Sequence, residues 1–196
     1  LCKRVLETLL QAKIDSLEYP QREKEMRLSV EGKTIRLDIY VKDCKDTLYD
    51  AEMQNQNGRT LDEMALPKRS RYYQSVMDTE SLKKGIHYRF LNESYVIFIC
   101  TFDPFGMGKY VYTFENICNE DNSLKLGDAA TKVFFNTKTK QEDIPEGIGR
   151  LFDYIENGIV SDELTEELDN EINRIRNDKN WWEAYMKTVV HDMDVR

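Results

Sequence analysis

Two segments in the first third of the chain alternate between apolar and polar side chains. Residues 35–41 place apolar side chains at the odd positions, and residues 47–54 place polar side chains at the even positions from Asp50 onward. Such alternation is typical of half-buried strands, whose successive side chains point to opposite faces of a sheet. A third strand is expected at 24–30, joined to the first segment by a short hairpin connection at 31–33.

Apolar spacing elsewhere predicts the other elements. Four apolar residues at helical spacing indicate an amphipathic helix over 2–13. A second helix is expected over 61–82, and Pro67 must either start or kink it. Extended segments are expected at 95–101, 110–117 and 132–136, with a structural turn at Asp103-Pro104-Phe105-Gly106.

The last quarter of the chain has helical periodicity. A short helix opens at Ile144-Pro145 and stops at Gly158, and Ser161 is expected to cap a longer helix. The longer helix carries an apolar stripe at steps of four and three that only Lys179 interrupts, made of Leu168, Ile172, Ile175, Trp182, Met186 and Val189. This stripe packs on its own domain or on a twin helix, so a homodimer through the C-terminal helix is one expectation.

Charge divides the chain into two parts. Residues 1–140 hold 22 Lys and Arg against 21 Asp and Glu, whereas residues 141–196 hold 6 against 15. The overall net charge of −8 therefore does not exclude a basic surface on the first part. We expect one α/β domain over 1–140 and an acidic helical extension over 141–196.

Composition excludes several classes of protein. No uncharged apolar run approaches the ~18 residues that a membrane span requires. The 4 cysteines are far apart and form no CxxC pair, which favours reduced thiols and a cytoplasmic location. His87 and His191 lack neighbours at ligand spacing, so a zinc site is not expected.

The polar faces of the alternating strands supply candidate metal ligands. If the two strands are neighbours, Asp38 and Glu52 converge with the amide oxygen of Gln54 on a spot that suits a hard divalent cation. The main-chain carbonyl of Met53 adds another oxygen. Mg²⁺ held there would polarise a phosphodiester and lower the pKa of an attacking water.

The strands alone also fit a structural interpretation, in which Asp38 and Glu52 pair with Arg36 or a lysine on a solvated face. On spacing alone we favour that interpretation, roughly two to one. The second helix shifts the balance, because it places three cations and two tyrosines within two turns: Lys68, Arg69, Arg71, Tyr72 and Tyr73. Such a helix suits phosphate clamping, although a solvated face with tyrosine in the core also fits it.

Several segments together carry a family likeness. The chain resembles the recombination-promoting nuclease (Rpn) / putative transposase family of the PD-(D/E)XK nuclease superfamily. The likeness runs through nearly the whole chain, over residues 36–41, 52–54, 66–74, 95–100, 102–106, 112–116 and 182–186.

The resemblance implies an αβββαβ core with a central mixed sheet and Mg²⁺- or Mn²⁺-dependent cleavage of DNA. By position, Asp38 and Glu52 match the two acidic residues of the superfamily motif, and Glu7 matches the acidic residue of the first core helix. Gln54 stands where the archetype has lysine, so a cation of the second helix is expected to replace that charge.

Two functional hypotheses follow. The first is a cytoplasmic, metal-dependent DNA endonuclease linked to recombination, transposition or phage defence. In it Asp38, Glu52 and the Met53 carbonyl hold the metal, and Glu7 helps through water. Gln54 positions the metal or the attacking water, and the basic helix clamps the phosphate. The second is a catalytically weak or inactive DNA-binding or assembly module of the same fold. RNA as the substrate is not excluded by the sequence.

Overall fold

The computed structural model describes residues 1–18, 27–31, 34–55, 65–82, 85 and 87–177. Its strands are β1 (Leu17–Glu18), β2 (Arg27–Glu31), β3 (Thr34–Asp43), β4 (Leu48–Gln54), β5 (Ser94–Cys100), β6 (Val111–Phe114) and β7 (Ala130–Asn136). Its helices are α1 (Cys2–Leu10), α3 (Leu66–Ser81), α4 (Glu146–Asn157) and α5 (Glu163–Asn177), with a short 3-10 helix η1 (Tyr88–Phe90).

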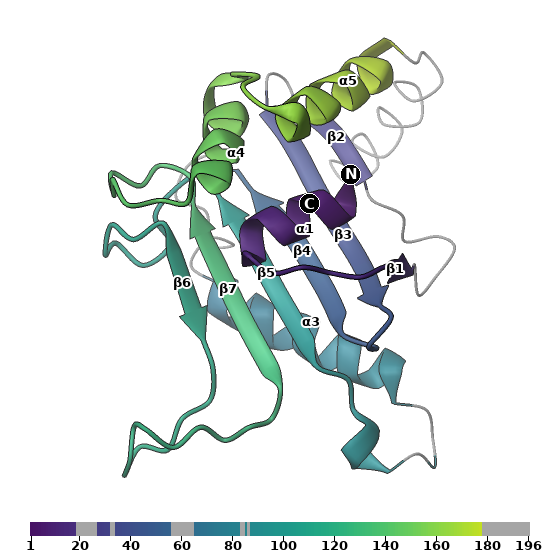
Figure 1. Cartoon of the computed structure of the whole chain (residues 1–196). Coiled ribbons are helices and arrows are strands. Elements are labelled where there is room, and N and C mark those ends of the chain that lie inside the picture. Colours follow the sequence, from purple (N-terminus) through teal and green to yellow (C-terminus); the bar gives the residue numbers. More distant parts are fainter. Residues whose placement is uncertain (19–26, 32–33, 56–64, 83–84, 86, 178–196) are drawn as a thin grey trace, which may run out of the picture.

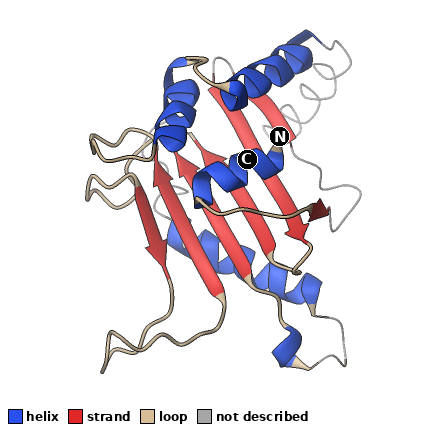
Figure 2. Ribbon diagram, in the orientation of Figure 1, coloured by secondary structure: helices blue, strands red, loops and turns tan. Residues whose placement is uncertain are grey.

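The strands form one mixed sheet of seven strands, in the order β1-β3-β4-β5-β7-β6 with β2 also paired to β3. Strands β2, β3 and β4 pair antiparallel, β4, β5 and β7 pair parallel, and β6 returns antiparallel to β7. Figure 1 shows α1, α4 and α5 on one face of this sheet and α3 on the other. The same layering of helices on both faces of the strands is visible in Figure 2.

The alternation of β3 and β4 divides their side chains between two cores. Ile39, Ala51 and Met53 pack with α1, α4 and α5, whereas Leu48 packs with α3. Strand β5 lies between β4 and β7 and is buried on both faces, which explains its uninterrupted apolar sequence. The predicted α/β class with an αβββαβ order is confirmed, since α1, β2, β3, β4, α3 and β5 occur in this order, with the two-residue strand β1 between α1 and β2.

Several predicted boundaries change. Helix α1 ends at Leu10 because Gln11 adopts the left-handed conformation with φ 50°, so it is shorter than the expected 2–13. Pro67 lies in the first turn of α3 and therefore starts this helix rather than kinking it. Residues 61–64 of the expected helix lie outside the described part.

The start of α5 differs from the expectation in a single residue. The Thr165 N–H donates to Asp162 Oδ1 at 2.8 Å, so Asp162 and not Ser161 caps the helix. The carboxylate is the better acceptor for an unsatisfied N–H at the positive end of a helix.

Helices α4 and α5 join the core that α1 forms with the sheet. Ile148 and Leu151 of α4 and Leu168 and Ile172 of α5 are all buried in this cluster. The described half of the apolar stripe thus packs on its own chain, while Trp182, Met186 and Val189 lie outside the described residues. Within the part of the chain that the structure describes, no helix is long and apolar enough to cross a membrane.

Candidate active site

Asp38 and Glu52 are direct cross-strand partners in the antiparallel pair of β3 and β4. Both lie on the face opposite Ile39 and Ala51, which is the face that α3 covers. Directly opposed side chains in such a pair have Cβ atoms about 4.5–5.5 Å apart, and like charges at that separation destabilise the sheet. One oxygen of Asp38, Oδ1, is also buried. Two carboxylates held together in this way favour a cation between or beside them.

Arg69 of α3 supplies a positive charge at this position. Its Nη2 donates to Glu52 Oε2 at 3.0 Å, and its Nη1 donates to Gln54 Oε1 at 2.8 Å. The Gln54 amide donates in turn to the main-chain carbonyl of Met53 at 3.1 Å. The Arg69 guanidinium therefore bonds to both Glu52 and Gln54. Gln54 is the residue that the resemblance aligns with a lysine of the superfamily motif.

Two aromatic rings fix the Arg69 guanidinium in place. Its Cζ lies 5.5 Å from the ring centroid of Tyr73 and 5.6 Å from that of Phe98. Arg69 Nη2 also donates to the Tyr73 hydroxyl at 2.8 Å. Burial raises the pKa of Tyr73; the Arg69 hydrogen bond opposes this rise, and the nearby Glu52 charge adds to it. The Tyr73 pKa therefore lies above its ordinary value, which favours the protonated hydroxyl.

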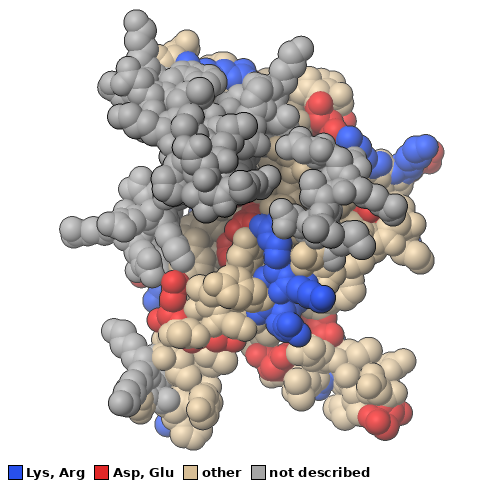
Figure 3. Space-filling view, turned by 180° about the vertical axis from the view of Figure 1, so that it is seen from behind, with Lys and Arg blue, Asp and Glu red and all other residues tan. Residues whose placement is uncertain are grey.

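The basic and tyrosine side chains of α3 point in two directions. Arg69 and Tyr73 are one turn apart and point toward the sheet, whereas Lys68, Arg71 and Tyr72 lie on the solvent side. Tyr72 is 65% exposed. Figure 3 shows basic side chains gathered near the middle of this face, with acidic side chains beside them. The three outward residues therefore lie away from the carboxylate pair.

The oxygen donors suit a divalent cation. Asp38 and Glu52 offer carboxylate oxygens, and Met53 offers a main-chain carbonyl. The Gln54 carbonyl accepts from Thr101 N–H, and carbonyls alternate along a strand, so the Met53 carbonyl points toward β3. Among the described residues there is no cluster of three or more Asp, Glu, His or Cys side chains that could hold a metal ion.

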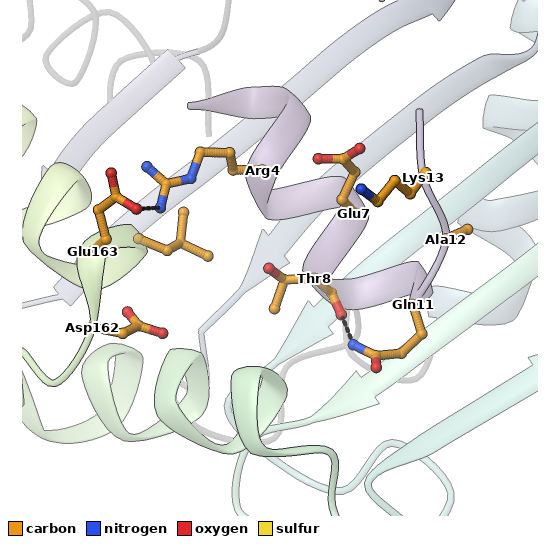
Figure 4. A pocket seen from close by; sticks show the side chains of 9 residues that line it. Arg4, Glu7, Thr8, Gln11, Ala12, Lys13, Asp162 and Glu163 are labelled. Carbon is orange, nitrogen blue, oxygen red and sulfur yellow. Dashed lines mark hydrogen bonds and ion pairs between the residues drawn. The ribbon is translucent and has the colours of Figure 1, made fainter. Parts of the chain in front are cut away.

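Glu7 lies on the other side of the sheet. Its helix α1 packs on the face that carries Ile39 and Met53, and its Oε1 accepts the Ile14 N–H at 2.9 Å. Figure 4 shows Glu7 in an open pocket between α1 and the start of α5, next to Lys13. The structure therefore does not bring Glu7 to Asp38 and Glu52, and its participation through water stays a prediction.

The Asp103 turn has the structural role expected of it. Asp103 Oδ1 accepts the N–H of Phe105 and Gly106 and the Tyr112 hydroxyl, and its Oδ2 accepts the Gly108 N–H at 2.7 Å. Burial favours a higher pKa for this carboxyl, but the Tyr112 and main-chain hydrogen bonds outweigh it and the pKa falls. The carboxylate organises this loop and takes no part in the acidic pair.

Phe98 is the site residue that the sequence does not single out. It is paired in register with Glu52 and lies under the Arg69 guanidinium. In the sequence it belongs to a run of similar apolar residues, none of which differs from its neighbours by pattern. Only the parallel register of β4 and β5 identifies the ring beside Glu52.

A mixed sheet with an acidic pair on adjacent strands and a basic helix over it defines an α/β protein of the PD-(D/E)XK nuclease type. A family model described as PD-(D/E)XK nuclease family transposase matches residues 2–144, and the chain belongs to this family. Membership supports a nuclease- or transposase-like function, as the resemblance implied. Searches among curated proteins and among solved structures gave no significant match.

Proposed function

We propose that the protein is a divalent-metal-dependent DNA endonuclease whose active site is built on Asp38 and Glu52. The observation that carries the proposal is their direct pairing on β3 and β4 beneath the Arg69 guanidinium. Asp38, Glu52 and the Met53 carbonyl would hold Mg²⁺ or Mn²⁺. The bound cation would polarise the scissile phosphate and lower the pKa of an attacking water.

Arg69 takes over the charge that a lysine supplies in the archetype. Of the three cations in this helix, it is the one whose guanidinium reaches both Glu52 and Gln54, while Lys68 and Arg71 are exposed. A planar guanidinium can donate to a carboxylate and to a phosphate oxygen at once. Arg69 would thus stabilise the negative charge that develops on the phosphate, with Gln54 keeping it aligned.

The exposed residues of α3 would bind the rest of the substrate. Lys68 and Arg71 provide sequence-independent contacts to backbone phosphates, and the Tyr72 hydroxyl can donate to a phosphate oxygen. Such contacts fix the position of a DNA strand over the carboxylate pair without reading its sequence.

Plasmid nicking with matched carboxamide variants tests the proposal. Asp38→Asn removes one ligand charge while keeping side-chain size, so nicking in Mg²⁺ should fall by more than the ~10–100-fold typical of outer-shell changes. Asp50→Asn is the control, since Asp50 lies on β4 opposite Tyr40, two residues from Glu52. Nicking should stop in EDTA. An Asp38→Asn protein that cuts as fast as wild type would end the assignment.

A second candidate function is a catalytically silent DNA-binding module. It is favoured by Gln54 in the lysine position and by the ion pair that already engages Glu52. Plasmid that is retarded on a gel but remains uncut in both Mg²⁺ and Mn²⁺ would support it over the nuclease.

A further inference from the structure

The helix η1 displays two aromatic rings to solvent at one end of the sheet. Tyr88 is 80% exposed and Phe90 is 60% exposed, although both belong to a short ordered turn. Figure 1 shows η1 beyond the end of α3, where β5 begins. Two large rings this exposed within three residues form an apolar surface in contact with water, and such surfaces often mark interaction sites.

The turn that carries these rings is held in place. Its hydrogen bonds run from Arg89 N–H to His87 Nδ1, from Phe90 N–H to the His87 carbonyl and from Leu91 N–H to the Tyr88 carbonyl. The Asn92 side chain donates to the Asp46 carbonyl at 2.6 Å, which joins the turn to the loop between β3 and β4. The rings are therefore presented on an ordered support, which lowers the entropy cost of binding a ligand.

A cation lies against one of the two rings. Arg89 places its Cζ 4.6 Å from the Phe90 ring centroid. An exposed ring with a guanidinium stacked on it matches an unpaired nucleic-acid base next to a phosphate. Bases inside a duplex are already stacked, so such a platform selects single-stranded nucleic acid.

Strand geometry gives the approximate distance from η1 to the carboxylate pair of Asp38 and Glu52. Leu48 is paired with Ser94, just after η1, and Glu52 lies four residues further along β4, a rise of ~13 Å. Adding the length of the turn gives about 15–20 Å, which corresponds to about five stacked nucleotides. Asp78 and Glu80 follow the basic residues on α3, so base stacking at η1, rather than an unbroken track of phosphate contacts, must anchor the strand.

We propose that Tyr88, Arg89 and Phe90 form a stacking platform for unpaired bases, so that the substrate is DNA with a single-stranded segment beside the cleaved position. This inference rests on the proposed nuclease function and specifies its substrate class.

Fluorescence anisotropy in EDTA tests the platform apart from cleavage. The full-length protein is titrated into a labelled 15-nucleotide oligo-dT and into a blunt 15-base-pair duplex. Tyr88→Ala with Phe90→Ala should weaken oligo-dT binding about tenfold or more and leave duplex binding unchanged. Because no charge is removed, the salt dependence of oligo-dT binding should keep its slope.

Controls separate this inference from the nuclease proposal. Met107→Ala, at a side chain that is 73% exposed, should bind both ligands as wild type does. Tyr88→Trp with Phe90→Trp should retain oligo-dT binding. Unchanged oligo-dT binding by the alanine variant, or equal losses for both ligands, overturns the platform even if wild type still nicks plasmid. A wild-type protein that neither binds nor nicks any DNA overturns both proposals.

Discussion

The ion pair between Arg69 and Glu52 would compete with a metal ion for the Glu52 carboxylate. The guanidinium neutralises this carboxylate at 3.0 Å, and a divalent cation bound to Glu52 must share or displace that contact. Under the proposed nuclease function, the Arg69 charge would therefore oppose metal binding in the free protein and support phosphate binding during the reaction. The two effects can be separated experimentally because only one of them needs DNA.

Arg69→Ala should move metal binding and nicking in opposite directions. Loss of the partly exposed ion pair should tighten Mn²⁺ binding about two- to fivefold in calorimetry. Nicking should fall about 100-fold, as when a donor to a developing oxyanion is removed. Arg71→Ala, which changes an exposed cation on the same helix, should leave Mn²⁺ affinity unchanged. Weaker Mn²⁺ binding in Arg69→Ala would show instead that Arg69 supports the metal site.

At the residue scale, the strand pattern was sufficient to place Asp38 on the polar face of one strand and Glu52 and Gln54 on the polar face of the other; the pairing of β3 with β4 brings these faces together. It was not sufficient to choose among the three cations of α3, because spacing within a helix does not say which side meets the sheet. The choice of Arg69 follows from the packing of Leu66 and Met77, which are buried and orient the helix.

At the scale of elements, the loop between β5 and β6 depends on one carboxylate. Asp103 accepts four hydrogen bonds, three from main-chain N–H groups and one from Tyr112. These bonds satisfy donors that the turn leaves without partners of its own, including that of Gly108, which adopts φ 72°. The loop in turn carries Phe105, which packs against Phe134 of the sheet.

Asp103→Asn should destabilise the fold by about 1–3 kcal/mol at pH 7, because an amide cannot accept all four bonds. The folded pKa lies below the ordinary value of 3.8, so the carboxylate's stabilisation is complete above that value and is lost as pH falls through the lower folded pKa. The difference in unfolding free energy between wild type and Asp103→Asn, measured by urea unfolding, should therefore be smaller at pH 3 than at pH 7. Asp128→Asn, at an exposed carboxylate, should show little change; an equal loss in both variants would contradict the prediction.

At the scale of the whole molecule, the acidic extension helps to complete the main core. Ile172 of α5 is 1% exposed and shares a cluster with Leu6 of α1 and Met53 of β4. Arg4 of α1 reinforces this contact through ion pairs with Glu163 and Glu167. Removal of α5 would therefore expose apolar surface of the core that α1, α4 and the sheet share.

Ile172→Ala should lower the free energy of unfolding by about 2–5 kcal/mol, the usual cost of truncating a buried side chain. Light scattering should give the same mass as wild type, since the side chain is buried within its own chain. Ile175→Ala, at a partly buried neighbour, should cost less. A change from dimer to monomer in Ile172→Ala would instead support the dimer expected from the apolar stripe.

The local periodicity of the sequence determined where most helices and strands lie and which face their side chains take. The two-residue repeat of β3 and β4 set the face of each carboxylate, and the helical repeat located α1, α3, α4 and α5, because both repeats follow from backbone geometry within one segment. The tertiary structure decided what depends on pairing between distant segments. It set the register that opposes Asp38 to Glu52 and brings Phe98 beside Glu52, the orientation that turns Arg69 inward, the position of Glu7 across the sheet, and the packing of α5 on the core.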